Sequence, residues 1–352
     1  MTLLVRNEAD VVDAQIAFHL NAGVDFVVAT DNSSDDGTAE ILERYERAGR
    51  LHLLREPADD MQQARWVTRM ARLAATEFEA DWVINSDADE FWWPRDGSLK
   101  DVFACIPLRY GAVCACWRHF VPRPDDGLFF ADRMTIRLAR PAFAGDKTTV
   151  FHAHQKIAHR GSPHVEVDAG NHYVSGPFLD PLPGWYPIEV LHFSIRSVLQ
   201  LEGKGRGGWA RNPTYVLAEH QRRVDEALNS GRIAAYFDSL VPKPDELDKG
   251  LADGTYVVDT RLRDVLRALR GHDAPAGQST FPDPGSGGMR VSLRPRTIAE
   301  DAGYASETAA LAELDSVVRG EARVAAIESR ISALEGSSLA RLAARGRRSS
   351  LP

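Results

Sequence analysis

Short apolar runs alternate with amphipathic stretches over the first ninety residues of the chain. The apolar runs predict buried strands at residues 2–5, 25–30, 51–54 and from 82–84 into the carboxylates that follow. Apolar positions near helical spacing predict helices from residue 10 to the stop at Gly23, at 39–48 and at 61–78. This alternation is typical of a parallel sheet built from right-handed crossover units. We therefore predict an α/β fold with a mostly parallel sheet flanked by helices.

The pattern is less regular after Pro94. Residues 112–120 and 129–138 predict further strands, and residues 213–228 predict a helix. Four glycines within residues 203–208 predict a mobile segment, which we interpret as a lid over a bound substrate. Residues 271–288 are rich in Gly, Pro, Ser and Asp and predict a linker.

The last stretch keeps a heptad-like apolar spacing, which predicts an amphipathic helix or short coiled coil; the positions are Val317, Val324, Ile327, Ile331 and Leu334. A basic tail follows it, and we expect this tail either to touch an anionic membrane face or to be a disordered, solubilising end. The predicted organisation is a catalytic domain at 1–270, a linker at 271–295 and a helical extension at 296–352. Within the domain we distinguish residues 1–95, 96–200 and 201–270.

Composition narrows the class of protein. The net charge of −8 argues against a general nucleic-acid binder, which needs a basic surface. No apolar run approaches the roughly 18 residues of a spanning helix, and no secretory signal is visible. We expect a cytoplasmic protein, with peripheral contact at the inner membrane face or self-association through the last helix as its further options.

Two carboxylates follow the fourth predicted strand. Asp87 and Asp89 stand at positions i and i+2 of the stretch Asp81–Trp93. In an extended chain such positions point to one side, so we expect the two carboxylates to converge at the carboxyl end of the strand. No basic residue is adjacent in sequence, so a hard divalent cation carrying substrate phosphates is the natural partner. The alternative is a polar turn that ends a strand.

Other polar residues are candidates for the same site. Asp31 follows the second predicted strand, where it either caps the next helix or accepts hydrogen bonds from a base or ribose. Six of the eleven histidines lie between residues 152 and 192. His152 and His154 have the spacing of half a zinc site, but no further ligand set is obvious. His172 and His192 are the better candidates.

Three segments carry a family resemblance: Leu4-Val5-Arg6-Asn7-Glu8, then Thr30-Asp31-Asn32-Ser33-Ser34-Asp35-Asp36-Gly37-Thr38, then Asp87-Ala88-Asp89-Glu90-Phe91. They resemble glycosyltransferase family 2, in particular a bacterial branch with Val-Arg-Asn-Glu and Asp-Ala-Asp-Glu-Phe-Trp motifs. The resemblance covers residues 3–95 and becomes patchier to about residue 200. It implies a GT-A fold, a nucleotide-sugar donor (by default a uridine nucleotide) and Mn²⁺ or Mg²⁺ beneath the diphosphate.

The resemblance also implies roles for single residues. Arg6, Asn7, Glu8, Asp31 and Arg69 match the nucleoside-binding positions. Asp87 would face the sugar or ribose and the metal, Asp89 would hold the metal, and a late histidine, His192 ahead of His172, would complete its ligands. Lys156, Arg160 and Arg196 are candidates to neutralise the diphosphate.

The resemblance implies inversion at the anomeric carbon, which needs a carboxylate base. The family's usual Glu-Asp signature for that base is absent, and Asp132 and Asp168 are the candidates, with Glu166 behind them. The acceptor is left open among a glycan, a lipid-linked molecule and a small molecule.

Three other classes share part of this pattern. A haloacid-dehalogenase-type phosphatase also has Asp-x-Asp after a strand, but on its first strand and with Thr or Val next, where this chain has Glu90. A sugar-nucleotide pyrophosphorylase needs a glycine-rich basic loop after its first strand, which is absent here. A non-catalytic scaffold with the same fold is the third alternative.

Overall fold

The computed structural model describes residues 1–58, 62–140, 149–152, 154–184, 186–207, 219–271, 281–282, 290–297, 299–300, 302–304, 306 and 308–309. The chain divides into two compact units, Met1–Ala305 and Ser306–Pro352. The first unit therefore runs beyond the predicted boundary at residue 270. Described residues of its last part pack on the preceding chain: the Phe281 amide donates to Asp13, and the Tyr304 hydroxyl donates to the carbonyl oxygen of Ile188. The predicted helix and basic tail after residue 310 lie outside the described residues.

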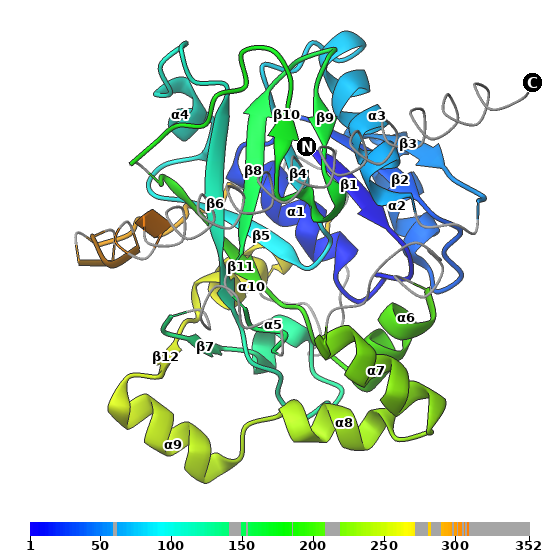
Figure 1. Cartoon of the computed structure of the whole chain (residues 1–352), viewed down its shortest axis with the longest axis vertical. Helices are drawn as coiled ribbons and strands as arrows, with labels where there is room; N and C mark the ends of the chain where they lie inside the picture. The colour runs from blue at the N-terminus through cyan, green and yellow to red at the C-terminus, as the bar shows by residue number, and fades with distance from the viewer. Residues whose placement is uncertain are drawn as a thin grey trace, which may run out of the picture. The chain divides into compact units, whose positions relative to one another are not determined.

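An eight-stranded sheet forms the centre of the first unit (Figure 1). Its strands are β1 (Thr2–Val5), β2 (Val27–Asp31), β3 (Leu51–Arg55), β4 (Trp82–Ser86), β5 (Glu90–Pro94), β6 (Ala112–His119), β8 (Gln155–Arg160) and β11 (Ile188–His192). Their order is β3-β2-β1-β4-β8-β6-β11-β5. The first four strands in this order are parallel, as are β6 and β11, while β8 and β5 pair antiparallel with their neighbours. The predicted α/β class with a mostly parallel sheet is confirmed.

Helices cover both faces of the sheet. The first half contributes α1 (Val12–Ala22), α2 (Thr38–Arg47), α3 (Gln63–Thr76) and α4 (Leu99–Ala104). The second half contributes α5 (Phe130–Arg133), α6 (Val198–Gly207), α7 (Glu219–Asn229), α8 (Ile233–Leu240), α9 (Pro244–Asp253) and α10 (Arg261–Arg270). Two small antiparallel pairs, β9 (Glu166–Val167) with β10 (Val174–Ser175) and β7 (Ile136–Leu138) with β12 (Tyr256–Val258), lie outside the main sheet. Among the described residues, no helix is both long and apolar enough to cross a membrane.

The alternation of side chains along each strand builds two separate cores. On one face, Leu3 of β1 and Ile84 of β4 pack into the large core that includes α1 and α10. On the other face, Val28 of β2 and Val83 of β4 pack against α3. The predicted alternation of strands and helices is thus present up to β4, because each of these elements has apolar residues to bury against the sheet or the helices.

One prediction for the later chain is wrong. Residues 129–138 form the short helix α5 followed by β7, not one strand-rich segment, because the Phe130 ring packs against Phe91 and Phe193 from a helical turn. The glycine-rich segment is helical as far as Gly207, where α6 (Val198–Gly207) ends, and its role as a mobile lid stays a prediction. Glycine costs about 1 kcal/mol in a helix. The burial of Leu201 in the apolar cluster of α7 and α8 offsets that cost.

Buried histidines make the fold sensitive to acid. The His19 ring lies between the Gln15 carbonyl oxygen, 2.8 Å from Nδ1, and the Trp92 amide, which donates to Nε2. Burial lowers the pKa of His19 to about 3, and it lowers the pKa of His119 and of His159 to about 4. An unfolded chain takes up these protons near pH 6.5, whereas the folded chain resists them.

We therefore expect the free energy of unfolding to be fully present above pH 6.5 and to fall as the pH drops toward 4. Each such imidazole contributes about 1.4 kcal/mol per pH unit in that window. Urea unfolding at several pH values between 5 and 7.5 measures the slope. The variant His19→Asn should unfold with a slope that is smaller by about one proton. An equal slope in variant and wild type would contradict this account.

Candidate functional site

The acidic motif lies in a turn between two strands, not along one strand. Strand β4 ends at Ser86, the chain turns through Asp87–Ala88–Asp89, and β5 begins at Glu90; the Glu90 amide donates to the Asp87 carbonyl oxygen at 3.2 Å. Because β5 pairs antiparallel with β11, Glu90 lies opposite His192, and the parallel pairing of β11 with β6 sets His192 beside His119. The strand register therefore brings two histidines to the acidic turn.

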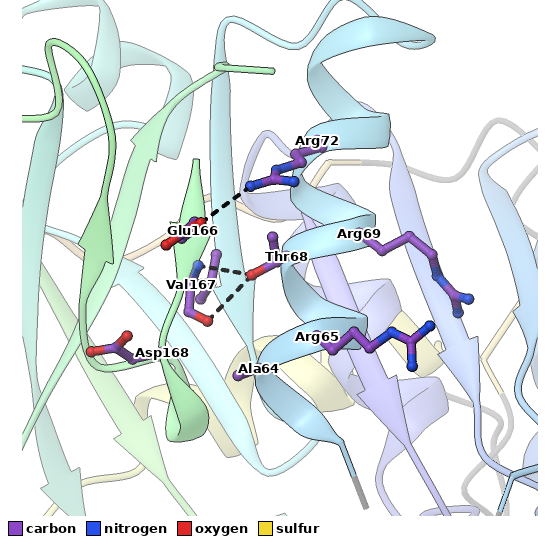
Figure 2. Close-up of a pocket in the computed structure, with 8 residues that line it drawn as sticks. All are labelled: Ala64, Arg65, Thr68, Arg69, Arg72, Glu166, Val167 and Asp168. Carbon is purple, nitrogen blue, oxygen red and sulfur yellow. Dashed lines mark hydrogen bonds and ion pairs between the residues drawn. The ribbon is translucent and has the colours of Figure 1, made fainter. Parts of the chain in front are cut away.

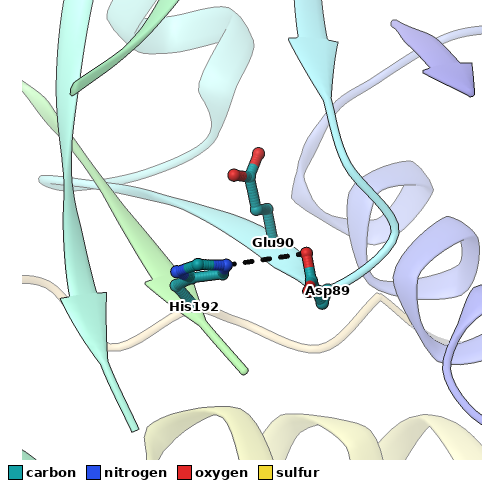
Figure 3. Close-up of side chains that lie close together, drawn as sticks. All are labelled: Asp89, Glu90 and His192. Atoms are coloured by element: carbon teal, nitrogen blue, oxygen red, sulfur yellow. Dashed lines mark ion pairs between the residues drawn. The ribbon is translucent and has the colours of Figure 1, made fainter. Parts of the chain in front are cut away.

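Asp89, Glu90 and His192 form a compact group, shown in Figure 3. One potential ligand atom of each lies within 4.8 Å of the others, and all three residues are buried. The His192 Nε2 atom is 3.7 Å from Asp89 Oδ1. The predicted pair of Asp89 and His192 is thus brought together, and Glu90 joins it in place of Asp87.

The hydrogen-bond chain behind His192 defines which of its nitrogens carries the proton. Burial lowers the pKa of both His192 and His119, so both rings are neutral near pH 7. His119 Nε2 lies 2.9 Å from the His152 carbonyl oxygen and must donate to it, which leaves a lone pair on His119 Nδ1. His192 Nδ1, 3.2 Å from that atom, therefore donates. The Nε2 lone pair of His192 then faces the carboxylate of Asp89, with no proton between them.

Three basic side chains from distant parts of the chain neutralise the turn. Lys204 Nζ of α6 lies 2.6 Å from Asp89 Oδ2. Lys156 Nζ of β8 lies 2.6 Å from Asp87 Oδ2 and 2.9 Å from Glu90 Oε1. Arg196 Nη1 lies 3.7 Å from Asp89 Oδ2. Burial alone would raise the pKa of Asp89, but Lys204 and Arg196 outweigh it and hold that pKa well below its usual range.

Carboxylates outnumber these cations. Among the residues that the structure describes, five acidic side chains share contacts with three basic ones: Glu8, Asp10, Asp87, Asp89 and Glu90 against Lys156, Arg196 and Lys204. The formal surplus is two negative charges. Burial, with added repulsion from Asp87 and Asp89, raises the pKa of Glu90 to about 8, although Lys156 opposes this. Burial likewise raises the pKa of Glu8 to about 7, against the pull of Arg196. The group is short of positive charge.

The chemistry of this group fits a divalent cation. Two carboxylates and a neutral imidazole nitrogen form a mixed oxygen and nitrogen set that suits Mn²⁺, and Mg²⁺ through its oxygens. The formal surplus of two negative charges matches the charge of one such ion. Asp89, Glu90 and His192 are the residues that would hold it.

Asp87 and Asp89 do not converge, so that prediction is wrong. The two oxygens of Asp87 contact Lys156 and the side-chain amide of Asn171, at 2.6 and 3.0 Å. Asp89 instead contacts Lys204 and lies beside His192. The reason is the turn at residues 87–89: the i and i+2 rule holds only for an extended chain. Asp87 lies at the turn, where its carboxylate can still contact a polar group of a bound ligand.

The residues predicted for a nucleoside lie at the carboxyl ends of β1 and β2. Asn7 has a positive φ of 54° and exchanges hydrogen bonds with Asp35 across the loop after β2. Arg6 donates to the Asn32 carbonyl oxygen at 3.1 Å, and Asp31 accepts from the Ser34 hydroxyl. These contacts hold the two loops together.

Glu8, predicted with the nucleoside residues, belongs with the acidic turn instead. Its carboxylate contacts the guanidinium of Arg196, which also contacts Asp10 at 2.7 Å and Asp89 at 3.7 Å. Arg196 thereby ties the start of α1 to the loop after β11. His172, the alternative to His192, contacts the Gln155 carbonyl oxygen through Nδ1, 2.8 Å away, and stacks on His154.

Arg69 and Asp168 line a separate groove of about 590 Å³ between α3 and β9 (Figure 2). Thr68 joins the two walls, since its hydroxyl accepts from the Val167 amide at 2.9 Å. Arg69 contacts Glu56 at 3.3 Å. Glu166 lies 3.7 Å from Arg72.

The second candidate base, Asp132, lies on α5. Its two oxygens contact Arg267 and Arg270 of α10, at 2.6 and 3.2 Å. Such a doubly paired carboxylate joins two helices.

Several residues of the site were not foreseen from the sequence. Glu90 belongs to the quoted motif, but nothing in the sequence predicts it as a metal ligand. Lys204 lies in the glycine-rich segment, which predicts mobility rather than a contact with Asp89. Trp117, whose ring stacks on His192 at 4.3 Å and donates to Glu90 at 2.8 Å, was read only as part of a strand. The sequence signal for this part of the site was the histidine-rich segment between residues 152 and 192, which includes His192.

The comparisons with known proteins agree in part with this site. The family model "Glycosyltransferase family 92" matches residues 5–106, a segment that runs from the last residue of β1 and contains α3 and the acidic turn. This match supports a glycosyltransferase, but it does not support family 2 specifically. No curated protein matches the chain.

Similar solved structures include the Staphylococcus aureus protein TarS, residues 1–349. It is 13% identical, with 71% of this chain and 77% of that chain covered and a TM-score of 0.32. The complex of the same fragment with UDP-GlcNAc has 13% identity, coverage of 71% and 74%, and a TM-score of 0.32. The complex with UDP has 11% identity, coverage of 84% and 98%, and a TM-score of 0.29. Likeness this weak carries no conclusion about substrate. The family match over residues 5–106 is what bears on function, and it supports a glycosyltransferase.

Proposed function

We propose that this chain is a metal-dependent glycosyltransferase that moves a sugar from a nucleotide-sugar donor, by default a uridine nucleotide, to a hydroxyl acceptor. The observation that carries the proposal is the lone pair of His192 Nε2 facing Asp89 Oδ1 at 3.7 Å. Two electron-rich atoms at that separation, in a group with surplus negative charge, call for a cation between them. The family match places this turn in a glycosyltransferase-like segment.

Each part of the site has a role in this proposal. Asp89, Glu90 and His192 hold the Mn²⁺ or Mg²⁺, which supplies positive charge for the departing diphosphate. The loops after β1 and β2, with Arg6, Asn7 and Asp31, surround the nucleoside. Asp87 orients the sugar or ribose, since Lys156 and Asn171 fix its carboxylate.

The acceptor hydroxyl must lose a proton as the new bond forms. Of the two predicted bases, contacts favour Asp168. It lies immediately before η1 (Ala169–Asn171), the short turn whose Asn171 contacts Asp87, and it lines the groove beside α3. We propose Asp168 as the base, a single displacement with inversion, and a glycan, lipid-linked or small-molecule acceptor.

Calorimetric titration of UDP, GDP and dTDP tests the proposal. Each nucleotide is added to wild-type protein with Mn²⁺, with Mg²⁺ or with EDTA, and to the variant Asp89→Ala. We expect one nucleotide to bind when metal is present and to lose its binding with EDTA and in Asp89→Ala, because the carboxylate and the ion together hold the diphosphate. A folded wild-type protein that binds none of the three nucleotides with metal present would refute the proposal.

A further inference from the structure

A lysine contacts the oxygen of Asp89 that does not face His192. Lys204 Nζ lies 2.6 Å from Asp89 Oδ2 and donates to the Ser194 carbonyl oxygen at 2.9 Å, whereas His192 Nε2 faces Asp89 Oδ1. An ammonium group at this distance neutralises the carboxylate much as a bound metal ion would. A divalent cation that approaches Asp89 Oδ1 therefore meets a positive charge on the same carboxylate.

The two cations at Asp89 differ in burial and in the number of their partners. Arg196 is completely buried, and Glu8, Asp10 and the Phe193 carbonyl oxygen hold its guanidinium. The Lys204 side chain is 28% exposed and extends from α6 on a flexible stem, so it is the one of the two that can change partners more readily.

The helix itself is anchored away from the site. Leu201 of α6 packs with Val224 of α7 and Phe237 of α8, together with Ile195 of the preceding loop. The backbone of α6 can therefore stay in place while the Lys204 side chain swings between partners. Its four-carbon stem allows such a change through rotamers alone.

We propose that Lys204 is an exchangeable counter-ion of the donor site: it neutralises Asp89 in the empty site, leaves Asp89 when a divalent cation binds there, and then pairs with the diphosphate of the nucleotide. The inference rests on the proposed function. It assigns Lys204 as a further diphosphate-binding residue, and it explains how a buried carboxylate is kept satisfied without donor. No covalent change is involved, since one ion pair replaces another.

The exchange predicts that one substitution of Lys204 strengthens the binding of Mn²⁺ and weakens the binding of UDP. In Lys204→Gln, Mn²⁺ alone should bind about tenfold more tightly than to wild type, because the competing positive charge is gone. With Mn²⁺ saturating, UDP should bind the same variant about tenfold more weakly, because its diphosphate has lost an ammonium partner. A residue with a merely structural role would weaken both.

The experiment combines two titrations. Loss of the free Mn²⁺ signal in electron paramagnetic resonance measures metal binding without nucleotide, and calorimetry measures UDP binding at saturating Mn²⁺. Arg206→Gln is the matched control, since Arg206 lies on the same helix, is 70% exposed and pairs with Glu202. It should leave both affinities unchanged. Lys204→Arg should restore UDP binding in part, and circular dichroism verifies that each variant is folded.

Two outcomes overturn the inference, and they differ in what they say about the proposed function. Equal Mn²⁺ affinity in wild type and Lys204→Gln, with no binding to Asp89→Ala, means that Lys204 does not compete; the metal-dependent transferase then stands without the exchange. Absence of Mn²⁺ binding in every variant, including Lys204→Gln, removes both the exchange and the metal site.

Discussion

Replacing Asp89 by asparagine should lower the rate of sugar transfer by about three orders of magnitude, because it removes the carboxylate at the centre of the site. Asp89 is 4% exposed and contacts Lys204, Arg196 and His192. A metal ion bound to a departing oxygen lowers the free energy of activation by several kcal/mol, and each 1.4 kcal/mol changes the rate about tenfold. The asparagine keeps the shape of the side chain but binds a divalent ion poorly.

The measurement is the turnover of the nucleotide sugar whose nucleotide binds in calorimetry, followed by release of that nucleotide. Asp25→Asn is the control, since Asp25 is exposed and pairs with Lys100 on the surface; its turnover should equal that of the wild type. Excess Mn²⁺ should recover part of the Asp89→Asn activity. Turnover within tenfold of the wild type in a folded Asp89→Asn would mean that Asp89 is not the metal ligand.

Replacing Arg196 by methionine should destabilise the fold by about 3–5 kcal/mol, the usual cost of breaking a buried ion pair from one side. The guanidinium is fully buried among Glu8, Asp10 and Asp89, and these carboxylates strongly raise its pKa despite the opposing effect of burial. Methionine fills much of the space but leaves three carboxylates without their shared partner. Urea unfolding at pH 7.5 measures the loss.

Two comparisons isolate the electrostatic part of that loss. Arg55→Met removes an exposed pair with Glu43 and should change stability by less than about 1 kcal/mol. Adding Asp10→Asn to Arg196→Met should recover part of the stability, because it removes one of the unpaired charges. If Arg196→Met unfolds at the wild-type urea concentration, the cluster does not contribute to the fold as described.

Much of the fold in the first ninety residues follows from local periodicity. Each strand from β1 to β4 has an apolar run, and α2 and α3 each have an apolar side, so periodicity identifies them; α1 is buried nearly all round. Where packing outweighed composition, prediction was wrong. Residues 129–138 predict a strand, yet the packing of Phe130 against Phe91 and Phe193 makes their first part helical.

The acidic motif was identifiable because all of its members are adjacent in sequence. The basic side chains that contact the motif could not be identified in this way. Lys204 is 115 residues from Asp89, and Lys156 is 69 residues from Asp87. A local pattern holds no information about which distant side chain fills a given space.

By itself, the amino-acid sequence determined the alternation of strands and helices and the acidic motif after the fourth strand. It also showed that histidines are concentrated between residues 152 and 192, the segment that supplies His192 to the site. The tertiary structure alone decided that Asp87 and Asp89 separate, that Glu90 takes the place of Asp87 beside His192, and that lysines neutralise the turn. The physical reason is that sequence periodicity and tertiary packing act over different distances along the chain. Periodicity acts over a few residues, whereas the register of β5 with β11 and the packing of α6 depend on the whole core.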